Sequence, residues 1–139
     1  MFICDISVFN RYGKQKLDEQ LEVLNLKWHD LVLLLVVEQI PGIEQARLIP
    51  FLQTDKANVT KLIQRLEQNN YIYRETNKTD KRNKNVFLTK EGKKLVPKLY
   101  EIMNIWEDAC FSEIEKSELE LYKKISSKII TNIMRNTNE

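Results

Sequence analysis

Apolar residues recur at helical spacing at both ends of this 139-residue chain. The first stripe lies within residues 2–24 and contains Phe2, Ile6, Phe9, Leu17, Leu21 and Leu24. Two further stripes lie in residues 95–110 and 122–133, with a polar break near residues 112–117. Spacings of three and four predict amphipathic helices. Gly13 costs the first helix about 1 kcal/mol relative to Ala, so that helix depends on packing, and Pro97 should bend the second.

The centre of the chain is patterned differently. Residues 31–37 are apolar all round, which predicts a helix buried on every side. A short helix is expected over about residues 44–51, although Pro50 lacks the N–H that an interior helical residue donates. The next helix, residues 56–69, has Asp55 as a good N-cap and buries Val59, Leu62, Ile63 and Leu66.

The strand signals lie in residues 71–89. Residues 71–76 and 85–88 are rich in aromatic and β-branched side chains. Between them lies NKTDKRNK, residues 77–84, which is wholly polar and prone to turns. This pattern predicts a β-hairpin with a cationic tip, followed by a helix that Thr89 caps.

The charge of the chain is unevenly distributed. Residues 55–98 contain 12 Lys or Arg against 5 Asp or Glu, and the remainder contains 10 against 15. The net charge of +2 therefore combines an excess of +7 in the middle with −5 elsewhere. A concentrated basic region suggests an anionic partner, although solvated lysines on helix surfaces would give a similar count.

Composition excludes most enzymatic chemistry. The chain has one histidine, His29, and two distant cysteines, Cys4 and Cys110. It has no phosphate-binding glycine loop and no recognisable pair of catalytic carboxylates, so we predict no catalytic residues, metal site or cofactor. No apolar run is long enough to span a bilayer and no leader is visible, which favours a cytoplasmic protein that does not act at a membrane.

The order of elements predicts a winged helix-turn-helix. The fold class is mainly α with a small β-hairpin wing. The second helix of the motif would offer its polar, cationic face to the major groove. The wing tip would lie along the backbone or in a minor groove, where A·T-rich DNA has an enhanced negative potential. The expected partner is therefore double-stranded DNA.

Residues 65–92, RLEQNNYIYRETNKTDKRNKNVFLTKEG, resemble the MarR family of bacterial transcription regulators. The family pattern is approximately RLExxGLIxRxxxxxDxRxxxxxLTxxG, and this chain departs from it only at Asn70 and Tyr71. The resemblance implies a single domain over residues 1–139 that forms a homodimer. Terminal helices at about residues 2–24 and 93–135 would make the dimer, and a lobe at about residues 27–92 would bind a palindromic operator, by family default as a repressor.

The resemblance also implies the DNA contacts. The recognition-helix residues are Lys56, Ala57, Asn58, Lys61 and Arg65, to which the pattern of polar positions adds Thr60. The wing residues are Asp80, Lys81, Arg82 and Lys84. In the family, the aspartate at the position of Asp80 steadies the wing and the arginine at the position of Arg82 enters the minor groove. The chain departs from the family at Gln53, where the turn usually has Gly, and at Lys27, where a Ser or Thr usually caps the buried helix.

The sequence leaves open which signal controls such a regulator. The resemblance implies a small amphipathic, often aromatic, effector, and the candidate pocket residues are Phe9, Tyr12, Trp28, Tyr100 and Trp106, with ordinary core packing as the other interpretation. Oxidation of Cys4 is a second possibility, but the adjacent Asp5 disfavours a thiolate, so a small buried apolar residue is the favoured interpretation for Cys4 and for Cys110. A remote alternative is a winged helix used only for protein contacts.

Overall fold

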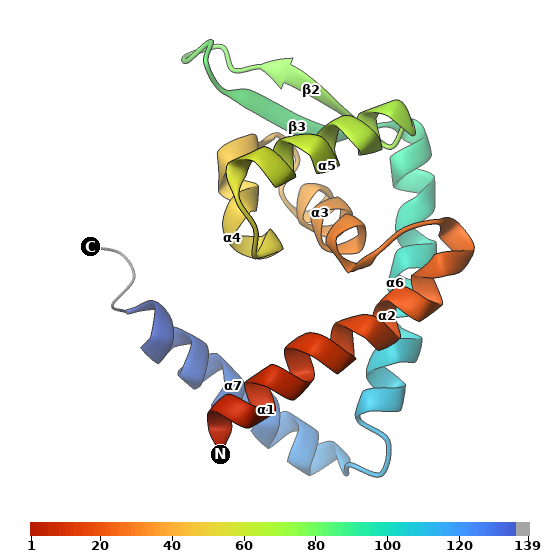
Figure 1. The fold of residues 1–139 in the computed structure, drawn as a ribbon, viewed down its shortest axis with the longest axis vertical. Coiled ribbons are helices and arrows are strands. Elements are labelled where there is room, and N and C mark those ends of the chain that lie inside the picture. The colour runs from red at the N-terminus through yellow and green to blue at the C-terminus, as the bar shows by residue number, and fades with distance from the viewer. Residues whose placement is uncertain (136–139) are drawn as a thin grey trace. The chain divides into compact units, whose positions relative to one another are not determined.

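The computed structural model describes residues 1–135. These residues fall into two compact units, residues 1–106 and the part that begins at residue 107. Helices account for most of the chain, and the strands form one small antiparallel sheet (Figure 1). The predicted fold class, mainly α with a hairpin wing, is therefore confirmed.

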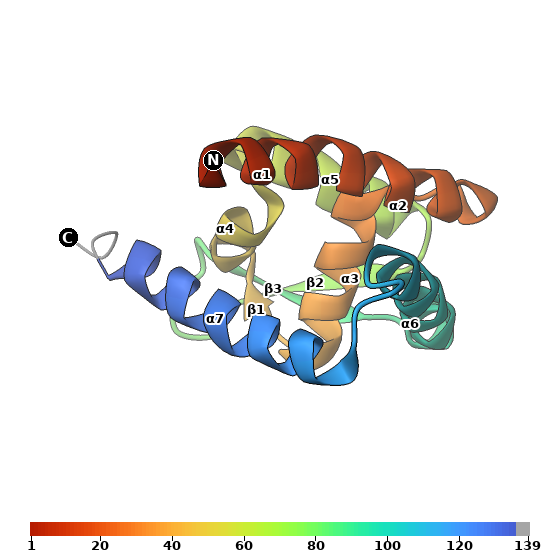
Figure 2. The same ribbon diagram turned by 90° about the horizontal axis from the view of Figure 1, so that it is seen from below.

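The N-terminal segment is a continuous helical rod made of three kinds of turn (Figure 2). It consists of α1 (Phe2–Val8), the π-helical turn η1 (Phe9–Gly13), α2 (Lys14–Leu21) and the 3₁₀ turn η2 (Glu22–Leu24). The prediction of one regular helix is corrected at η1. The widened turn ends at Gly13, whose carbonyl oxygen accepts a 3.1 Å hydrogen bond from the indole N–H of Trp106. A single π-helical turn inserted into an α-helix is rare and is frequently found at functional sites.

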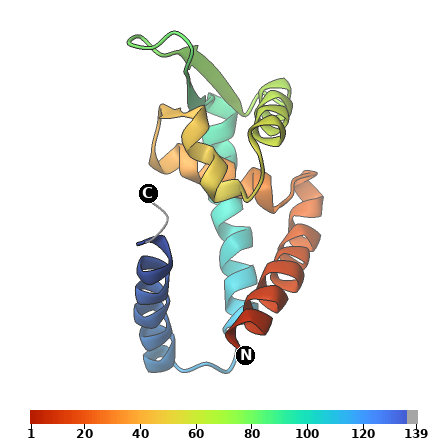
Figure 3. The same cartoon turned by 60° about the vertical axis from the view of Figure 1, so that its left-hand side comes forward.

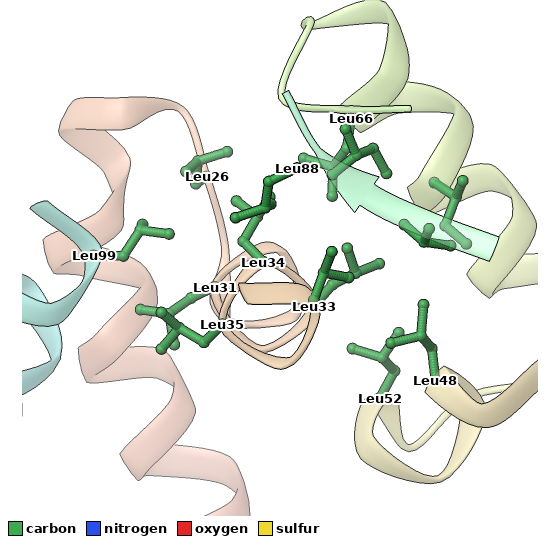
Figure 4. Packing of buried hydrophobic residues seen from close by; sticks show 14 of the residues in the cluster. Leu26, Leu31, Leu33, Leu34, Leu35, Leu48, Leu52, Leu66, Leu88 and Leu99 are labelled. Atoms are coloured by element: carbon green, nitrogen blue, oxygen red, sulfur yellow. The ribbon is translucent and has the colours of Figure 1, made fainter. Parts of the chain in front are cut away.

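The helix α3 (Trp28–Gln39) is the centre of the first unit. Its residues Leu31, Leu33, Leu34, Leu35 and Val37 are all buried, as the pattern predicted. In Figure 4, leucines from the surrounding elements are gathered around α3, which is seen nearly end-on.

Carboxylates close the N-terminus of α3 where Lys27 replaces the usual Ser or Thr. Asp18 accepts a 2.7 Å hydrogen bond from the Trp28 N–H, and Asp30 accepts one of 2.7 Å from the Lys27 N–H. A lysine ammonium has no acceptor, so these two side chains alone do the capping. One carboxylate from α2 and one from α3 therefore replace the hydroxyl that usually caps this helix.

The predicted helix over residues 44–51 is confirmed as a helical segment but corrected in its kind and its start. The segment is a two-residue strand β1 (Ile43–Glu44), a 3₁₀ turn η3 (Gln45–Leu48) and one α-turn, α4 (Ile49–Leu52). Pro50 lies in the first turn of α4, where a backbone N–H has no intrahelical partner in any case. Gln53 ends α4 with a left-handed backbone, φ 49°.

The helix α5 (Lys56–Gln68) is followed by the strands β2 (Ile72–Thr76) and β3 (Lys84–Leu88). Both the helix and the hairpin lie within a residue or two of their predicted bounds. The sheet order is β1-β3-β2, with Ile43 opposite Val86 and Ile72 opposite Leu88. The sequence analysis missed β1, because two residues are too few to show an alternating pattern. The hairpin projects beyond α5 at one end of the unit (Figure 3).

The helix α6 (Lys90–Cys110) begins as predicted at Thr89, whose hydroxyl oxygen accepts a 3.0 Å hydrogen bond from the Gly92 N–H. Pro97 lies inside this helix. The second unit consists of the last residues of α6, a short connection and α7 (Lys116–Met134). Within it the rings of Phe111 and Tyr122 are 5.7 Å apart, and no residue of α7 is buried.

Candidate nucleic-acid interface

The start of α5 is a tight polar cap. Asp55 accepts a 2.8 Å hydrogen bond from the backbone N–H of Asn58. The Asn58 amide also donates to the hydroxyl of Thr54 at 3.0 Å and to the second oxygen of Asp55 at 3.4 Å. The cap therefore fixes where the helix begins and holds the Asn58 side chain at its exposed end.

One face of α5 is polar and open to solvent. Lys56, Ala57, Asn58 and Lys61 are exposed, whereas the face that carries Val59, Ile63 and Leu66 is buried. Within residues 1–135, no ion pair engages Lys56 or Lys61. No side chain of the described residues therefore neutralises these two charges.

Thr60 belongs to a network behind the helix. Its hydroxyl donates to the carbonyl of Lys56 at 2.9 Å and accepts a 3.1 Å hydrogen bond from the Gln45 amide. The carbonyl of that amide accepts a 3.1 Å bond from Arg74 of β2. The Arg74 guanidinium in turn donates hydrogen bonds to both carboxylate oxygens of Glu67, at 2.7 and 3.0 Å. This chain of bonds joins η3, α5 and the wing.

Arg65 stands apart from the other recognition-helix candidates. Its guanidinium pairs with the carboxylate of Asp30, which is completely buried at the start of α3. The Arg65 side chain itself is 48% exposed. It therefore connects the surface of α5 to the interior of the unit.

The wing tip is built around two polar side chains. The Asn77 side-chain oxygen accepts bonds from the N–H of Thr79 at 2.9 Å and of Asp80 at 3.1 Å. Asp80 accepts from the backbone and the guanidinium of Arg82 at 3.1 and 3.3 Å. The Arg82 side chain is 92% exposed. The contact with Asp80 therefore orients the side chain near the backbone while the guanidinium stays in solvent. The remaining tip cations, Lys78 and Lys81, are exposed as well.

The helix α5 and the wing share a cleft. A cavity of about 140 Å³ is lined by Lys56 of α5, by Arg82 and Lys84 of the wing, and by Gln45, Ala46, Ile49, Val59 and Asn83. Lys84 also donates to Thr76 across the hairpin at 3.0 Å. Tertiary folding thus brings together cations from two elements that the sequence analysis assigned to DNA separately.

The predicted effector residues are dispersed. Phe9 and Tyr12 are exposed on the N-terminal rod, while Trp28, Tyr100 and Trp106 are partly buried against the core. A cavity of about 300 Å³ lies instead among α3, the wing strands and α6, and none of the five residues lines it. Its walls include the stacked rings of Tyr73 and Phe87, 5.3 Å apart, together with Val37, Glu38, Pro41, Leu88, Lys93, Val96 and Pro97.

The cysteines differ from their favoured interpretation. Both Cys4 and Cys110 are exposed thiols, so burial as small apolar residues is wrong for the single chain. The helix that carries Cys4, α1, has no buried residue, whereas Cys110 ends α6, a helix whose earlier residues Val96, Leu99 and Ile102 are buried. Partial desolvation, and then the charge of Glu107, raise the pKa of the Cys110 thiol. The described residues contain no cluster of side chains that could hold a metal ion, and none of their helices meets the length and hydropathy needed to cross a bilayer.

Sequence reasoning missed three residues of this interface, namely Gln45, Glu67 and Arg74. A signal was present for two of them, because Glu67 and Arg74 both stand at fixed positions of the pattern in residues 65–92. Their bidentate pairing shows what those positions do: they fix the wing to the recognition helix. Gln45 gave no signal in the sequence.

Comparisons with known proteins agree with this geometry. The model of the MarR family matches residues 26–84. Transcriptional regulator HosA of Escherichia coli O127:H6 is 30% identical over 90 residues, which are 65% of this chain and 67% of that protein. A MarR transcriptional regulator from Methanosarcina mazei has a similar structure, with a TM-score of 0.83, 28% identity and coverage of 95% of this chain and 96% of that one.

A further solved structure was determined with nucleic acid. It is a MarR family protein from Listeria monocytogenes complexed with 26mer DNA, with a TM-score of 0.86, 25% identity and coverage of 96% of this chain and 89% of that one. Members of the family are transcriptional regulators and not enzymes, which confirms the class predicted from the sequence. The chain belongs to the MarR family of transcriptional regulators.

Proposed function

We propose that this protein is a sequence-specific, homodimeric repressor that binds a palindromic operator. In each lobe α5 enters the major groove with Asn58 at the base edges, and Lys56, Ala57 and Lys61 lie beside the backbone. The wing places Arg82 in the minor groove, steadied by Asp80, with Lys81 and Lys84 beside the phosphates. The observation that carries the proposal is the cleft that Lys56 shares with Arg82 and Lys84.

Salt dependence tests the nucleic-acid partner. Each neutralised phosphate releases condensed counterions, so affinity should fall by roughly three to five decades between about 50 and 200 mM salt for some six to ten contacts. Fluorescence anisotropy with the chain's own upstream DNA and with unrelated DNA of equal length would measure it. A flat response, or equal affinity for both DNAs at every salt concentration, would exclude a sequence-specific DNA regulator and favour the protein-interaction alternative.

Dimerisation is supported by apolar surface in each unit. The N-terminal rod exposes Phe2, Ile3, Ile6, Val8 and Phe9, and α7 exposes Leu121, Tyr122, Ile125 and Ile130. Apolar stripes of this extent are typical of protein interfaces. A second copy of the chain fits, because homo-oligomers most often pair identical surfaces about a two-fold axis. The dimerisation helices would be those at about residues 2–24 and 93–135.

Sedimentation of the full chain tests the dimer. We expect a dimer at micromolar concentration, and a monomer when Ile6 and Ile125 are both replaced by Glu. Replacing the exposed Lys16 and Lys128 by Glu is the matched control. These two substitutions also add carboxylates to the same helices, but they remove no apolar side chain. A monomeric full chain would contradict the dimer.

An effector that releases the DNA is proposed to be small and amphipathic. The cavity beside Tyr73 and Phe87 is of a size that suits such a molecule, and it adjoins the wing strands. Thermal-shift screening would detect binding, because a ligand of the folded state raises its stability. Binding that shifts the melting temperature equally in Phe87→Ala would place the ligand elsewhere, with the region of Trp28 and Trp106 next to be tested.

Oxidation of Cys4 is the second candidate signal, and its exposure is the observation that favours it. If peroxide releases DNA from the wild type and from Cys110→Ser but not from Cys4→Ser, the regulator is redox-controlled. Equal release from all three, or no release, excludes this mechanism.

A further inference from the structure

Arg65 and Asp30 connect the two helices on which DNA recognition depends. Asp30 is fully buried in the first turn of α3, and Arg65 lies in the last turns of α5. One Asp30 oxygen accepts the Lys27 N–H at 2.7 Å, and the other accepts Nη2 of Arg65. Asp30 is the sole charged residue among residues 1–135 that is classed as buried. A buried carboxylate needs a charged partner, because an unpaired one is strongly destabilising.

The apolar contacts of α5 fix its orientation less strictly than a directional bond does. Val59, Ile63 and Leu66 pack into the core, but the free energy of burying apolar area is not directional. A charge-assisted hydrogen bond is directional and fixes one geometry. On its other side α5 is held by the pair between Glu67 and Arg74, with both side chains less than 30% exposed. The two ion pairs therefore hold the C-terminal half of α5 between α3 and the wing.

We propose that Arg65 is a positioning residue, which orients the recognition helix through Asp30 and does not neutralise a DNA phosphate. This inference rests on the proposed DNA-binding function. The charge of Arg65 is already balanced within the protein, whereas Lys61, one turn earlier on the same helix, has no ion-pair partner within the described residues. Of Lys61 and Arg65, Lys61 is thus the residue that neutralises a DNA phosphate.

The slope of log affinity against log salt separates the two roles. Each phosphate contact contributes about 0.9 to that slope in B-DNA. Arg65→Gln should lower operator affinity about five- to tenfold, as expected for the loss of a coupled ion pair, and leave the slope at its wild-type value. Lys61→Gln is the matched control, and it should reduce the slope by about 0.9 for each lobe bound. Arg65→Lys, which keeps the charge and a donor, should recover part of the affinity.

Asp30→Asn should change DNA affinity in opposite directions, depending on whether Arg65 positions α5 or contacts a phosphate. Because Asp30 is buried, it cannot touch DNA. If it positions Arg65, Asp30→Asn should weaken binding by about the same factor as Arg65→Gln, and the double variant should be no weaker than either single one. If Arg65 instead contacts a phosphate, removing its carboxylate partner should strengthen binding.

The measurements use the full chain at a temperature where circular dichroism shows every variant folded. A slope in Arg65→Gln reduced as far as in Lys61→Gln would overturn the proposal, and this holds even if Asp30→Asn fails to fold. Tighter DNA binding by a folded Asp30→Asn would overturn it as well. Failure of the proposed function looks different, since wild-type protein would then show no salt-dependent binding at all.

Discussion

The ammonium of Lys14 in α2 donates a 2.5 Å hydrogen bond to the side-chain oxygen of Gln53, 39 residues further along the chain. Gln53 is the left-handed residue of the turn that leads into the recognition helix. The same ammonium also donates to Asn10 at 2.5 Å and lies 3.8 Å from the centre of the Trp28 ring. Lys14 thus ties the N-terminal rod both to α3 and to the approach to α5.

Replacing Lys14 by Met should lower the free energy of unfolding by about 1–2 kcal/mol, because two hydrogen bonds and a cation–π contact are lost. Lys16→Met is the matched control. Lys16 is 72% exposed and meets only Glu19, at 3.5 Å, so its loss should change stability by less than about 0.5 kcal/mol. Urea unfolding of both variants measures the difference, and equal effects would show that the Lys14 contacts add nothing.

Stability should fall in mild acid because of His29, the one histidine of the chain. Desolvation, followed by the charge of Lys14, holds the pKa of His29 below its ordinary value of 6.5, against the opposing charges of Asp30 and Asp18. The unfolded chain therefore binds the proton more readily than the folded one. The His29 contribution is complete above about pH 6.5 and is lost as the pH falls from there towards the folded-state pKa.

Urea titrations at pH 7.5 and 5.5 should show this loss, and His29→Gln should reduce it. NMR titration of the single imidazole gives the pKa directly, and Lys14→Met should raise it by removing a nearby positive charge. A wild-type pKa at or above 6.5 would contradict the prediction.

Two glycines should respond to alanine in opposite directions. A Cβ on Gly92 would lie 2.1 Å from the backbone oxygen of Tyr71, which cannot move without shifting the start of β2. Gly92→Ala should therefore cost at least about 2 kcal/mol. A Cβ on Gly13 would meet only the Trp106 ring, at 3.8 Å, so Gly13→Ala should be neutral or stabilise by up to about 1 kcal/mol. Thermal unfolding of both variants checks the contrast.

Asn58 and Arg82 should differ in what they contribute to DNA recognition. Asn58→Ala should relax the preferred sequence, at about 1–3 kcal/mol of discrimination for a base contact. Arg82→Ala should weaken operator and unrelated DNA alike and reduce the salt slope, because the minor groove carries little sequence information. Asp80→Ala should reproduce part of the Arg82→Ala effect without loss of fold. If selection from randomised sites returns an unchanged motif for Asn58→Ala but a new one for Arg82→Ala, these roles are reversed.

Local signals in the sequence were enough for α3, α5 and the hairpin. The unbroken apolar run predicts the buried helix α3. Asp55 and the spacing of Val59, Ile63 and Leu66 predict α5, and the polar tip between two strand signals predicts the wing. Each of these depends on interactions within a few residues, so periodicity and capping express them directly. The exposed cations Lys56, Lys61 and Arg82 could be read for the same reason, since their positions follow from which helix and loop faces are apolar.

Only the tertiary structure decided which residues of the chain contact each other. The strand β1 exists because β3 is there to pair with it, the π-turn at Gly13 accompanies a bond to Trp106, and Pro50 is tolerated because the helix begins one residue before it. Arg65 looked like its neighbour Lys61 in sequence, and its pairing with Asp30 across 35 residues sets it apart. The sequence by itself determined which faces are apolar and which are charged. Which charge meets another charge depends on the packing of helices distant in the chain, because a Coulombic contact depends on distance in space and not on separation along the chain.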